Sequence, residues 1–423
     1  MELKKYKLAD IADFNKSSIS KSETFKEIIY LDTSSITENV VSGTVVMNTK
    51  EAPSRAQRKV TNNTIIYSTV RPRLKHYGIL SRPQNNFIIS TGFTTIDIKD
   101  LYKDKIDPRY LYLLLTQPTI TDYIGNIADT AVSAYPSINP SDLSSLCFMF
   151  PDYDIQKTIA DIWNNYDRKI ELNRAINQNL EAMAKQLYDY WFVQFDFPNE
   201  EGKPYKSSGG KMVWNEKLKR EIPEGWDISL IKDIATTYSG GTPKSTNIEY
   251  YDNGEIAWIN SGELNSPIIT KTTNYITKCG LENSSAKLYP SNSILVAMYG
   301  ATAGKVSLLT FEACSNQAVC GVIPTIENML YYVYFHISSL YSHFITLSTG
   351  SARDNISQDT IKNILLPIPT RNILKLFDEK IGSIYQTIVN NYQQIDSLTK
   401  QRDELLPLLM NGQVSVNSDL SDD

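Results

Sequence analysis

The chain of 423 residues contains little cysteine and histidine, and this scarcity excludes several kinds of site. None of its four cysteines forms a Cys-x-x-Cys pair, so neither a disulfide framework nor a zinc knuckle is predicted. The spacing of Cys314, Cys320, His336 and His343 also differs from that of a zinc finger, and we expect core or structural roles for them. With three histidines and no Ser/His/Asp or Cys/His set, nucleophilic catalysis is not predicted.

Long apolar runs are absent too. No segment is apolar enough to cross a bilayer, and residues 1–5 (MELKK) lack the apolar run of a secretory signal. We therefore expect a cytoplasmic protein. A hydrophobic content of 41% and an aromatic content of 10% are typical of a globular chain, and its length allows two or three domains.

What the chain does contain is an internal repeat, in which one constant offset takes Ile155 to Ile373 and Asn173 to Asn391 without a gap. Each copy runs from a globular segment through a proline, Pro151 or Pro369, into a long helix-forming segment. The offset grows within the globular segments while the frame is preserved, which predicts one fold used twice, with insertions in its loops. The other aligned pairs are Ile159 and Phe377, Tyr166 and Ile384, and Ile170 and Ile388.

The globular segments mix strand-like runs at 64–68, 87–90 and 292–297 with helical runs at 110–115 and 331–336. The predicted fold is mixed α/β (α+β), with two globular domains joined by two long helices that form an antiparallel coiled coil. The repeat adds a pseudo-two-fold relation between the halves. The predicted segments are a first domain at 1–151, a first long helix at 152–196, a linker at 197–227, a second domain at 228–369, a second long helix at 370–412 and a disordered acidic tail at 413–423.

Each long helix carries seam residues at alternating spacings of four and three, which is the pattern of a coiled coil. Asn173 and Asn391 stand at equivalent places, where a polar side chain costs stability but can fix the register. We expect these two asparagines to pair with each other; the alternative is a locally exposed seam. Pro407 is expected to break or kink the second helix and Gly412 to end it. The predicted seam residues are Ile155, Ile159, Ile162, Tyr166, Lys169, Asn173, Ile176, Leu180, Met183, Leu187 and Tyr190, and then Phe377, Ile381, Ile384, Ile388, Asn391, Ile395, Leu398, Arg402, Leu405 and Leu409.

The net charge of −5 argues against indiscriminate binding of nucleic acid, but the charge is unevenly distributed. Residues 1–150 hold 18 Lys and Arg against 15 Asp and Glu, a net of +3, whereas the remainder holds 24 against 32, a net of −8. Between residues 51 and 82, seven basic residues are opposed only by Glu51. A solvated loop explains such a run about as well as a rigid, proline-containing loop at 70–78 that presents guanidinium groups to phosphates.

Motifs of catalytic type are absent or incomplete. The chain lacks the Asp/Asn-Pro-Pro-Tyr/Phe signature of a methyltransferase, so it is not expected to transfer a methyl group itself. Residues 300–305 (GATAGK) resemble a phosphate loop with one residue too few, and Val306 replaces the Ser or Thr that would hold magnesium. A tight strand turn or a loop on DNA phosphate is the better interpretation. Residues 378–380 (DEK) mimic the end of a nuclease motif, but a solvated helix face explains them better.

The order of several motifs resembles the specificity subunit of Type I restriction-modification systems over essentially the whole chain. Similarity to the family's central and distal helical regions runs through residues 156–198 and 402–412. Segments similar to those that recur in target recognition domains are 239–245 (SGGTPKS), 299–305 (YGATAGK), 355–357 (NIS) and 366–369 (LPIP). The first domain departs from this pattern, because it has NKSS at 15–18 and VRPR at 70–73 in the corresponding places. This difference fits two domains of different sequence preference.

The resemblance implies a non-catalytic subunit that recognises a bipartite target in double-stranded DNA, one half-site per domain. It implies docking of two modification (methyltransferase) subunits through the helices, with restriction (translocase/endonuclease) subunits joining the complex. S-adenosylmethionine, Mg²⁺ and ATP would then be bound by those partners and not by this chain, and no metal is expected. A coiled-coil adaptor that does not bind DNA, or an NTPase that uses the 300–305 loop, are the alternatives.

Candidate DNA-binding residues are chosen by side-chain chemistry within these segments. Arginine suits guanine edges and phosphate, Thr302 and Asn316 can bond to bases, and Lys244 and Lys305 suit phosphate. A core position is the alternative for Tyr299. The full set is Arg55, Arg58, Arg71, Arg73, Lys75 and Tyr77 in the first domain, and Thr242, Lys244, Ser245, Tyr299, Thr302, Lys305, Asn316 and Arg353 in the second.

Overall fold

The computed structural model describes residues 3–20, 23, 25–130, 135–349 and 356–413, without the side chains of 347–349. The candidate Arg353 and residues 414–423 of the predicted tail lie outside the described residues. The chain divides into two compact units. Unit 1 comprises residues 1–168 and 399–423, and unit 2 comprises residues 169–398. Each long helix therefore contributes residues to both units.

Unit 1 is built on two four-stranded sheets. Its strands are β1 (Lys4–Lys7), β2 (Ala12–Phe14), β3 (Glu27–Leu31), β4 (Ile36–Thr37), β5 (Val40–Val41), β6 (Val45–Asn48), β7 (Ala56–Lys59), β8 (Ile65–Ser68), β9 (Tyr77–Ile79), β10 (Phe87–Ser90), β11 (Phe93–Ile98) and β12 (Cys147–Phe150). Its shorter helices are α1 (Leu8–Ile11), α2 (Pro108–Leu115), α3 (Pro118–Asp129) and α4 (Pro140–Ser144). The first sheet has the antiparallel order β2-β11-β8-β9, and the second has the order β6-β3-β10-β7 with β3 and β10 parallel.

Strand β8 shows how the core of unit 1 is layered. All four of its residues are buried. Ile65 and Tyr67 pack with residues of α2 and α3. Ile66 points to the opposite face, because successive residues of a strand alternate, and it packs with Leu31 and Ile89 of the second sheet. The first sheet therefore lies between the helices and the second sheet, which is why β8 is apolar on both faces.

Unit 2 repeats this plan with additions. Its strands are β13 (Met212–Asn215), β14 (Arg220–Pro223), β15 (Asp227–Leu230), β16 (Ala235–Ser239), β17 (Ile256–Ile259), β18 (Ile268–Ile269), β19 (Tyr275–Ile276), β20 (Ser293–Ala297), β21 (Val306–Leu309), β22 (Cys314–Ser315), β23 (Val319–Pro324) and β24 (Leu365–Ile368). Its shorter helices are α6 (Ile231–Ile234), α7 (Lys278–Glu282), α8 (Leu330–Ser339), α9 (Tyr341–Thr349) and α10 (Gln358–Lys362). The larger sheet has the order β16-β23-β20-β21-β18, and the smaller has the order β19-β17-β22.

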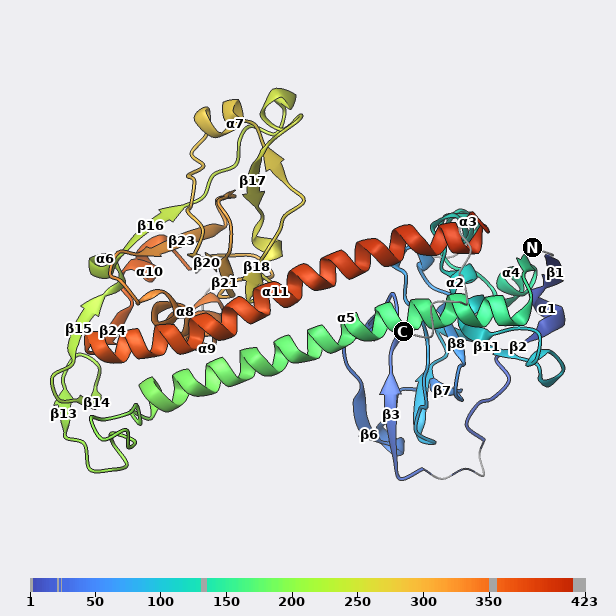
Figure 1. The fold of residues 1–423 in the computed structure, drawn as a ribbon, viewed down its shortest axis with the longest axis horizontal. Coiled ribbons are helices and arrows are strands. Elements are labelled where there is room, and N and C mark those ends of the chain that lie inside the picture. The colour runs from blue at the N-terminus through green and yellow to red at the C-terminus, as the bar shows by residue number, and fades with distance from the viewer. Residues whose placement is uncertain (1–2, 21–22, 24, 131–134, 350–355, 414–423) are drawn as a thin grey trace, which may run out of the picture. The chain divides into compact units, whose positions relative to one another are not determined.

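The predicted internal repeat is confirmed by this topology. The order β2-β11-β8-β9 of the first domain returns as β16-β23-β20-β21, and the parallel pair β3 and β10 returns as β17 and β22. In each domain the first strand pairs with the last, β1 with β12 and β15 with β24, and the second of these pairs is labelled in Figure 1. The offset from β12 to β24 equals that between the long helices, whereas the offset from β8 to β20 is larger. The growing offset thus reflects loop insertions within a preserved frame.

The long helices α5 (Tyr153–Tyr188) and α11 (Arg371–Met410) run antiparallel in both units (Figure 1). In unit 1 Arg402 lies 3.3 Å from Asp167, and in unit 2 Asn391 lies 2.8 Å from Asn177, so positions rise along α5 as they fall along α11. A π-helical turn (Asp189–Val193) extends α5. Every predicted seam residue of α11 is buried or half-buried, in agreement with the sequence pattern.

The seam predicted for α5 is half right. Ile159, Ile162, Tyr166, Asn173, Leu180 and Leu187 are buried or half-buried as expected, whereas the other five predicted residues are exposed: Ile155, Lys169, Ile176, Met183 and Tyr190. At four of these places the buried position is one residue later than predicted, at Gln156, Ile170, Asn177 and Ala184. At Asn177 and Ala184 a polar or small side chain occupies the seam while its apolar neighbour is exposed.

The segment predicted as a linker is folded. Strands β13 and β14 form an antiparallel hairpin. Asp196 accepts hydrogen bonds from the backbone N–H and the hydroxyl of Ser207 at 2.7 and 2.6 Å. Phe197 stacks between Tyr205 and Trp226, with ring centroids 4.6 and 5.3 Å away. The segment therefore belongs to the main hydrophobic core of unit 2.

The end of α11 differs from expectation at its proline. The helix continues through Pro407 to Met410, so the prediction of a break is wrong; the exposed Pro407 is near enough to the end for the lost hydrogen bond to be tolerated. Gly412 follows with a φ of 69°, the left-handed conformation that commonly ends a helix. In the described part of the chain, no helix combines the length and the apolar character needed to span a membrane.

Candidate DNA interface

A tight turn between β8 and β9 carries the central basic residues of the first domain. Pro72 opens a short 3-10 helix, Pro72–Leu74, which Arg71 and Lys75 flank with φ angles of 49° and 56°. This left-handed conformation costs a residue with a side chain about 1–2 kcal/mol. The N–H of Arg71 also donates to the carbonyl of Pro136 at 2.8 Å. The turn is therefore held by backbone hydrogen bonds, and it places two cations at strained positions.

Arg73 is held against helix α3. Its guanidinium group lies 3.0 Å from Asp129 and 3.5 Å from Asp122, and it donates to Asn126 at 2.7 Å. A Cβ atom at Gly125 would come within 2.7 Å of this group, so a larger residue there would require the Arg73 side chain to shift. Arg73 thus anchors the turn to α3, and a contact between Arg73 and DNA stays a prediction.

Arg71 and Lys75 are exposed, but Tyr77 is not. The Arg71 guanidinium lies 4.7 Å from the ring centroid of Tyr135, and Lys75 forms an ion pair with Glu38 at 2.6 Å. Tyr77 is only 4% exposed and stacks on a core tyrosine, because it is the first residue of β9 and faces the α2 side of the sheet. The expectation that Tyr77 is presented together with the arginines is therefore wrong.

Arg55 and Arg58 belong to the second sheet of the first domain, at strand β7. Arg55 precedes the strand, is exposed, and lies 3.4 Å from Asp32. Arg58 lies within the strand and is half-buried, and its Nε atom has no hydrogen-bond partner among the described residues. Burial lowers the pKa of this guanidinium group. The structure does not bring these two residues into contact with the β8–β9 turn, and their DNA contacts stay predictions.

The second domain has the same turn with glycines in place of the cations. Gly300 and Gly304, between β20 and β21, have φ angles of 87° and 80°. The offset from Arg71 to Gly300 equals that from Lys75 to Gly304, so the left-handed positions coincide. A phosphate loop of the P-loop type leads from a strand into a helix, whereas this turn joins two antiparallel strands. The interpretation as a tight strand turn is thus confirmed, and the fold gives no support to an NTPase.

Three candidates in this turn have structural roles. Thr302 is 5% exposed and donates to the carbonyl of Ser261 at 2.9 Å, so the expectation that its hydroxyl faces DNA bases is wrong. Lys305 donates to the amide oxygen of Asn265 at 2.5 Å. Tyr299 is half-buried against the core of unit 2, and burial raises its pKa. These contacts attach the turn to the segment that follows β17.

The Gly240–Gly241 pair lets a second loop pack closely beside this surface. A Cβ atom at Gly240 would lie 2.1 Å from the carbonyl oxygen of Asn316, and one at Gly241 would lie 2.3 Å from a backbone nitrogen. Next in the chain, the hydroxyl of Thr242 donates to the side-chain oxygen of Gln317. Lys244 and Ser245 follow as exposed residues. The glycines therefore hold Thr242 against the turn at 315–318.

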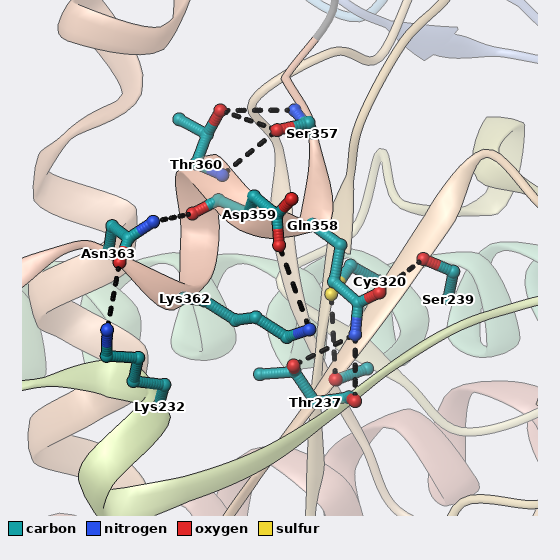
Figure 2. A network of polar contacts seen from close by, with 11 residues as sticks. Lys232, Thr237, Ser239, Cys320, Ser357, Gln358, Asp359, Thr360, Lys362 and Asn363 are labelled. Atoms are coloured by element: carbon teal, nitrogen blue, oxygen red, sulfur yellow. Dashed lines mark hydrogen bonds and ion pairs between the residues drawn. The ribbon is translucent and has the colours of Figure 1, made fainter.

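Helix α10 holds the base of this loop (Figure 2). Ser357 caps the helix by accepting from the backbone N–H of Thr360 at 3.0 Å. Gln358 donates to the backbone oxygen and the hydroxyl of Thr237 at 2.8 and 2.9 Å, and accepts from Ser239 at 3.2 Å. Because Ser239 immediately precedes the glycine pair, α10 fixes the point at which the loop leaves β16.

Four residues of this surface are missing from the sequence-based candidates: Asn260, Ser261, Asn265 and Gln317. Asn316 donates to Asn260 at 3.3 Å and accepts from the N–H of Ala318 at 3.1 Å, so its amide is used within the protein. Four candidates lie around Asn260: Thr242, Thr302, Lys305 and Asn316. Among the described residues, Lys244 and Ser245 do not contact these four. The one sequence pattern that could have pointed to these residues is the Asn-x-x-Glu capping box at 260–263.

The two seam asparagines do not pair with each other. Asn391 donates to Asn177 at 2.8 Å, and Asn173 donates to Gln394 at 3.2 Å. Asn177 also donates to the backbone oxygen of Ile388 at 3.3 Å. The reason is the register, which places the partner of Asn391 one helical turn beyond Asn173. The expected pairing is thus wrong in its partners, and the role of Asn173 and Asn391 in fixing the register stays a prediction.

The remaining chemical candidates are structural. Cys314 and Cys320 are buried, and burial raises the pKa of each thiol to about 12. Among the described residues, no group of three His, Cys, Asp or Glu could hold a metal ion. Residues 378–380 lie on α11 with Asp378 half-buried and the other two exposed, which matches the solvated helix face expected for them.

Comparison with known proteins gives the same result for both halves of the chain. Residues 1–182 and 223–405 match the Type I restriction modification DNA specificity domain. The HindI specificity subunit of Haemophilus influenzae is 27% identical, over 97% of this chain and 99% of its own length. The MjaIX specificity subunit of Methanocaldococcus jannaschii is 26% identical, over 80% of this chain and 76% of its own length.

Solved structures agree at the level of the fold. The crystal structure of a Type I restriction-modification system S subunit from M. genitalium superposes with a TM-score of 0.59 and 15% identity, covering 97% of this chain and 96% of that one. The matched family segments contain both sets of repeated strands described above. The chain therefore belongs to the family of the Type I restriction-modification DNA specificity domain, as a specificity subunit.

Proposed function

We propose that this chain recognises a bipartite DNA target, with one half-site bound by each domain. The observation that carries the proposal is the repeated strand order with different side chains at the same turn: Arg71 and Lys75 in the first domain, Gly300 and Gly304 in the second. One fold used twice presents two surfaces of similar geometry. Different side chains on those surfaces would then read different bases.

The first domain would contribute a large share of the electrostatic part of the binding free energy for DNA. It has a net charge of +3 over residues 1–150, and its β8–β9 turn is rigid and basic. Lys and Arg that neutralise phosphates release counterions, so the affinity falls steeply with salt. Arg71, whose side chain is exposed, is suited to the edge of a guanine or to a phosphate.

In the second domain, contacts with DNA would come more from side-chain amides and from backbone groups that lie close to the DNA. Gly300 is exposed on the β20–β21 turn, and Gln317, which accepts a hydrogen bond from Thr242, is an exposed amide. A glutamine amide can pair with the edge of an adenine through two hydrogen bonds. The proposed contacts of Lys244 and Ser245 with phosphate rest on their exposure alone.

Partner subunits would dock on the long helices. The apolar residues of α5 that lie beside the seam form an exposed stripe, with Leu172, Ile176 and Met183 at 52%, 44% and 56% exposure. Their spacings of four and seven place them on one helix face. An exposed apolar stripe of this kind is typical of a protein interaction site. We assign it to a modification subunit, and Leu172→Glu with Met183→Glu should abolish co-purification with that subunit.

The complete assembly follows from this assignment. Two modification subunits, one per half of the repeat, would transfer the methyl group from S-adenosylmethionine, and restriction subunits would supply the steps that need ATP and Mg²⁺. This chain would contribute recognition alone. A helix of 36 residues, such as α5, is about 54 Å long, so the helices would set the spacing between the half-sites.

The test is co-expression with the neighbouring modification subunit, followed by mapping of methylated positions in host DNA. A split motif with a fixed spacer is the expected result. If a stable complex forms but no motif appears, and the affinity for DNA does not fall with salt, the chain is an adaptor that does not read DNA.

A further inference from the structure

The first domain contains a run of seven exposed, uncharged residues, 40–46 (VVSGTVV), outside the candidate DNA-binding set. Four of them are valines: Val40 is 43% exposed, Val41 44%, Val45 56% and Val46 65%. The run comprises β5 and the beginning of β6, which is the edge strand next to β3 (Figure 1). An exposed apolar edge strand favours unwanted association, so its presence here indicates a binding surface.

The β4–β5 hairpin attaches this run to the basic turn between β8 and β9. The two loop residues of the hairpin, Glu38 and Asn39, have φ angles of 46° and 67°. Positive φ at both positions is typical of a tight, two-residue hairpin loop. The backbone N–H of Glu38 donates to the carbonyl of Lys75, and that of Asn39 donates to the carbonyl of Tyr77, both at 2.9 Å. Val40, which follows the loop, is therefore held beside the basic turn.

The second domain has a segment in the corresponding place. After β17, the counterpart of β3, the backbone oxygen of Ser261 accepts from Thr302 at 2.9 Å, and the side chain of Asn265 accepts from Lys305 at 2.5 Å. In both domains, therefore, the segment that follows this strand contacts the turn. Its side chains are polar at the contacts of the second domain, whereas the first domain adds four valines. A repeated part of the surface whose side chains differ between the domains is suited to determining sequence preference.

Charged groups precede the run but do not occur within it. Arg55 lies 3.4 Å from Asp32, just after β3, and Lys75 lies 2.6 Å from Glu38, at the hairpin loop. Because each of these cations has a carboxylate partner, the run itself offers methyl groups more than charge. In the major groove, apolar side chains recognise thymine by contact with its C5-methyl group, and this groove is wide enough for a two-stranded β-ribbon.

We propose that the valines of residues 40–46 contact thymine methyl groups in the major groove, so that the first half-site contains at least one A·T pair. This inference rests on the proposed function, because it names a base that the first domain recognises. The run would lie in the groove, and Arg71 on the adjoining turn would contact the base edge or phosphate beside it. Each methyl group that is removed from water on binding should contribute about fourfold to the affinity.

The experiment uses the complex with the modification subunit and duplexes that carry its mapped motif. Deoxyuridine replaces thymidine in the first half-site, identified as the one whose binding Arg71→Ala weakens, and this removes only the methyl groups. The affinity should fall about fourfold for each contacted thymine. A first half-site without A·T pairs, or equal affinity for the two duplexes, overturns the inference alone. Absence of any motif and of salt-dependent DNA binding overturns the proposed function itself.

Two variants assign the effect to the valines. Val45→Ser with Val46→Ser, and Val40→Ser with Val41→Ser, each remove four methyl groups from exposed positions. At least one of them should bind the thymidine and deoxyuridine duplexes equally. Val213→Ser, at a valine of β13 that is also 44% exposed, is the matched control and should keep the difference. If both folded variants keep it, the inference is overturned. Self-association of the free chain that these variants abolish would also overturn it, by assigning the run to a second copy.

Discussion

The β8–β9 turn and the β20–β21 turn have nearly the same backbone and opposite chemistry. Both have two left-handed positions at the same spacing, occupied by Arg71 and Lys75 in one domain and by Gly300 and Gly304 in the other. Glycine adopts this conformation without strain, whereas a residue with a side chain does not. The turn is therefore present in both domains. In the first domain two cations occupy its left-handed positions, and this lowers the conformational stability of the turn.

The smaller sheets also differ in that the first domain carries additional basic residues. In the first domain, strand β7 extends the sheet to the order β6-β3-β10-β7 and brings in Arg58 and Lys59. In the described part of the second domain, the matching sheet ends at β22. The larger sheets differ in the reverse direction, because β18 adds a strand next to β21 in the second domain. Variation is thus confined to turns and sheet edges, and the shared strands carry the common core.

The largest expected effect comes from removing the cations of the first turn. Arg71→Ala with Arg73→Ala should weaken binding to the first half-site by on the order of 100-fold, because a specific contact of Arg71 would contribute about 1–3 kcal/mol and the loss of Arg73 also releases the turn from α3. Methylation mapping and a binding titration at constant salt measure this change. Recognition of the second half-site should persist.

The matched control is Lys244→Ala with Ser245→Ala in the second domain, at exposed residues proposed to contact phosphate, which should affect only the other half-site. Equal loss of both half-sites in either double variant would point to unfolding or to failed assembly, and the two domains would then not act separately.

The next largest effect concerns His336, whose counterpart on α2 is Leu114. Burial, with a smaller contribution from nearby Arg220, lowers the pKa of His336 to about 4. Its Nδ1 atom lies 3.2 Å from the Tyr188 hydroxyl, and its Nε2 atom has no partner among the described residues. The unfolded chain binds the proton more tightly, so the free energy of unfolding should fall by on the order of 3 kcal/mol as the pH drops from about 6.5 to about 4.

Above pH about 6.5 both states are neutral at this residue, and no such dependence is expected. His336→Leu, which introduces the residue of the first domain, should remove this part of the acid sensitivity. Urea unfolding near pH 7 and near pH 4.5 measures the difference. An unchanged pH dependence in the variant would show that other groups cause the acid sensitivity.

A smaller effect is expected when the turn residues are exchanged between the domains. Lys75→Gly should raise the free energy of unfolding by about 1 kcal/mol through relief of the left-handed strain, while weakening DNA binding. Gly304→Ala should lower it by about the same amount, and its Cβ would also lie 3.1 Å from Phe344. Thermal unfolding of both variants provides the measurement. A less stable Lys75→Gly would mean that the ion pair with Glu38 outweighs the strain.

The smallest change in stability is expected at the asparagines between the helices. Asn177→Leu with Asn391→Leu replaces both partners of a buried hydrogen bond, which is often nearly neutral, so the free energy of unfolding should change by less than about 1 kcal/mol. The register should change more, with an altered spacer in the methylated motif. Asn173→Leu with Gln394→Leu, at a more exposed pair, is the control. An unchanged spacer in the first variant would exclude a role of Asn177 and Asn391 in the register.

The repeat made the fold predictable, because two copies of one pattern identify strands and helices that a single copy leaves ambiguous. The seam of α5 was harder to predict, because the apolar Ile176 and Met183 lie outside it while the polar Asn177 lies within it. Tyr77 is the buried first residue of β9 and follows a run of exposed turn residues, and the start of this strand is not visible in the sequence. Asn260 meets Asn316, and Gln317 meets Thr242, only through folding, and nothing in their local sequence marks these residues as neighbours.

The pairing of β1 with β12 and of β15 with β24 has a consequence for how new variants of this protein can arise. A domain whose first and last strands are hydrogen-bonded neighbours has its entry and exit points together, so its interior can be replaced as a cassette with little disturbance of the chain on either side. Recombination between related genes at these strands would exchange one set of loops and leave both long helices intact. Two crossovers, one at each end of the cassette, would then replace the recognition surface of one domain and leave the rest of the chain unchanged.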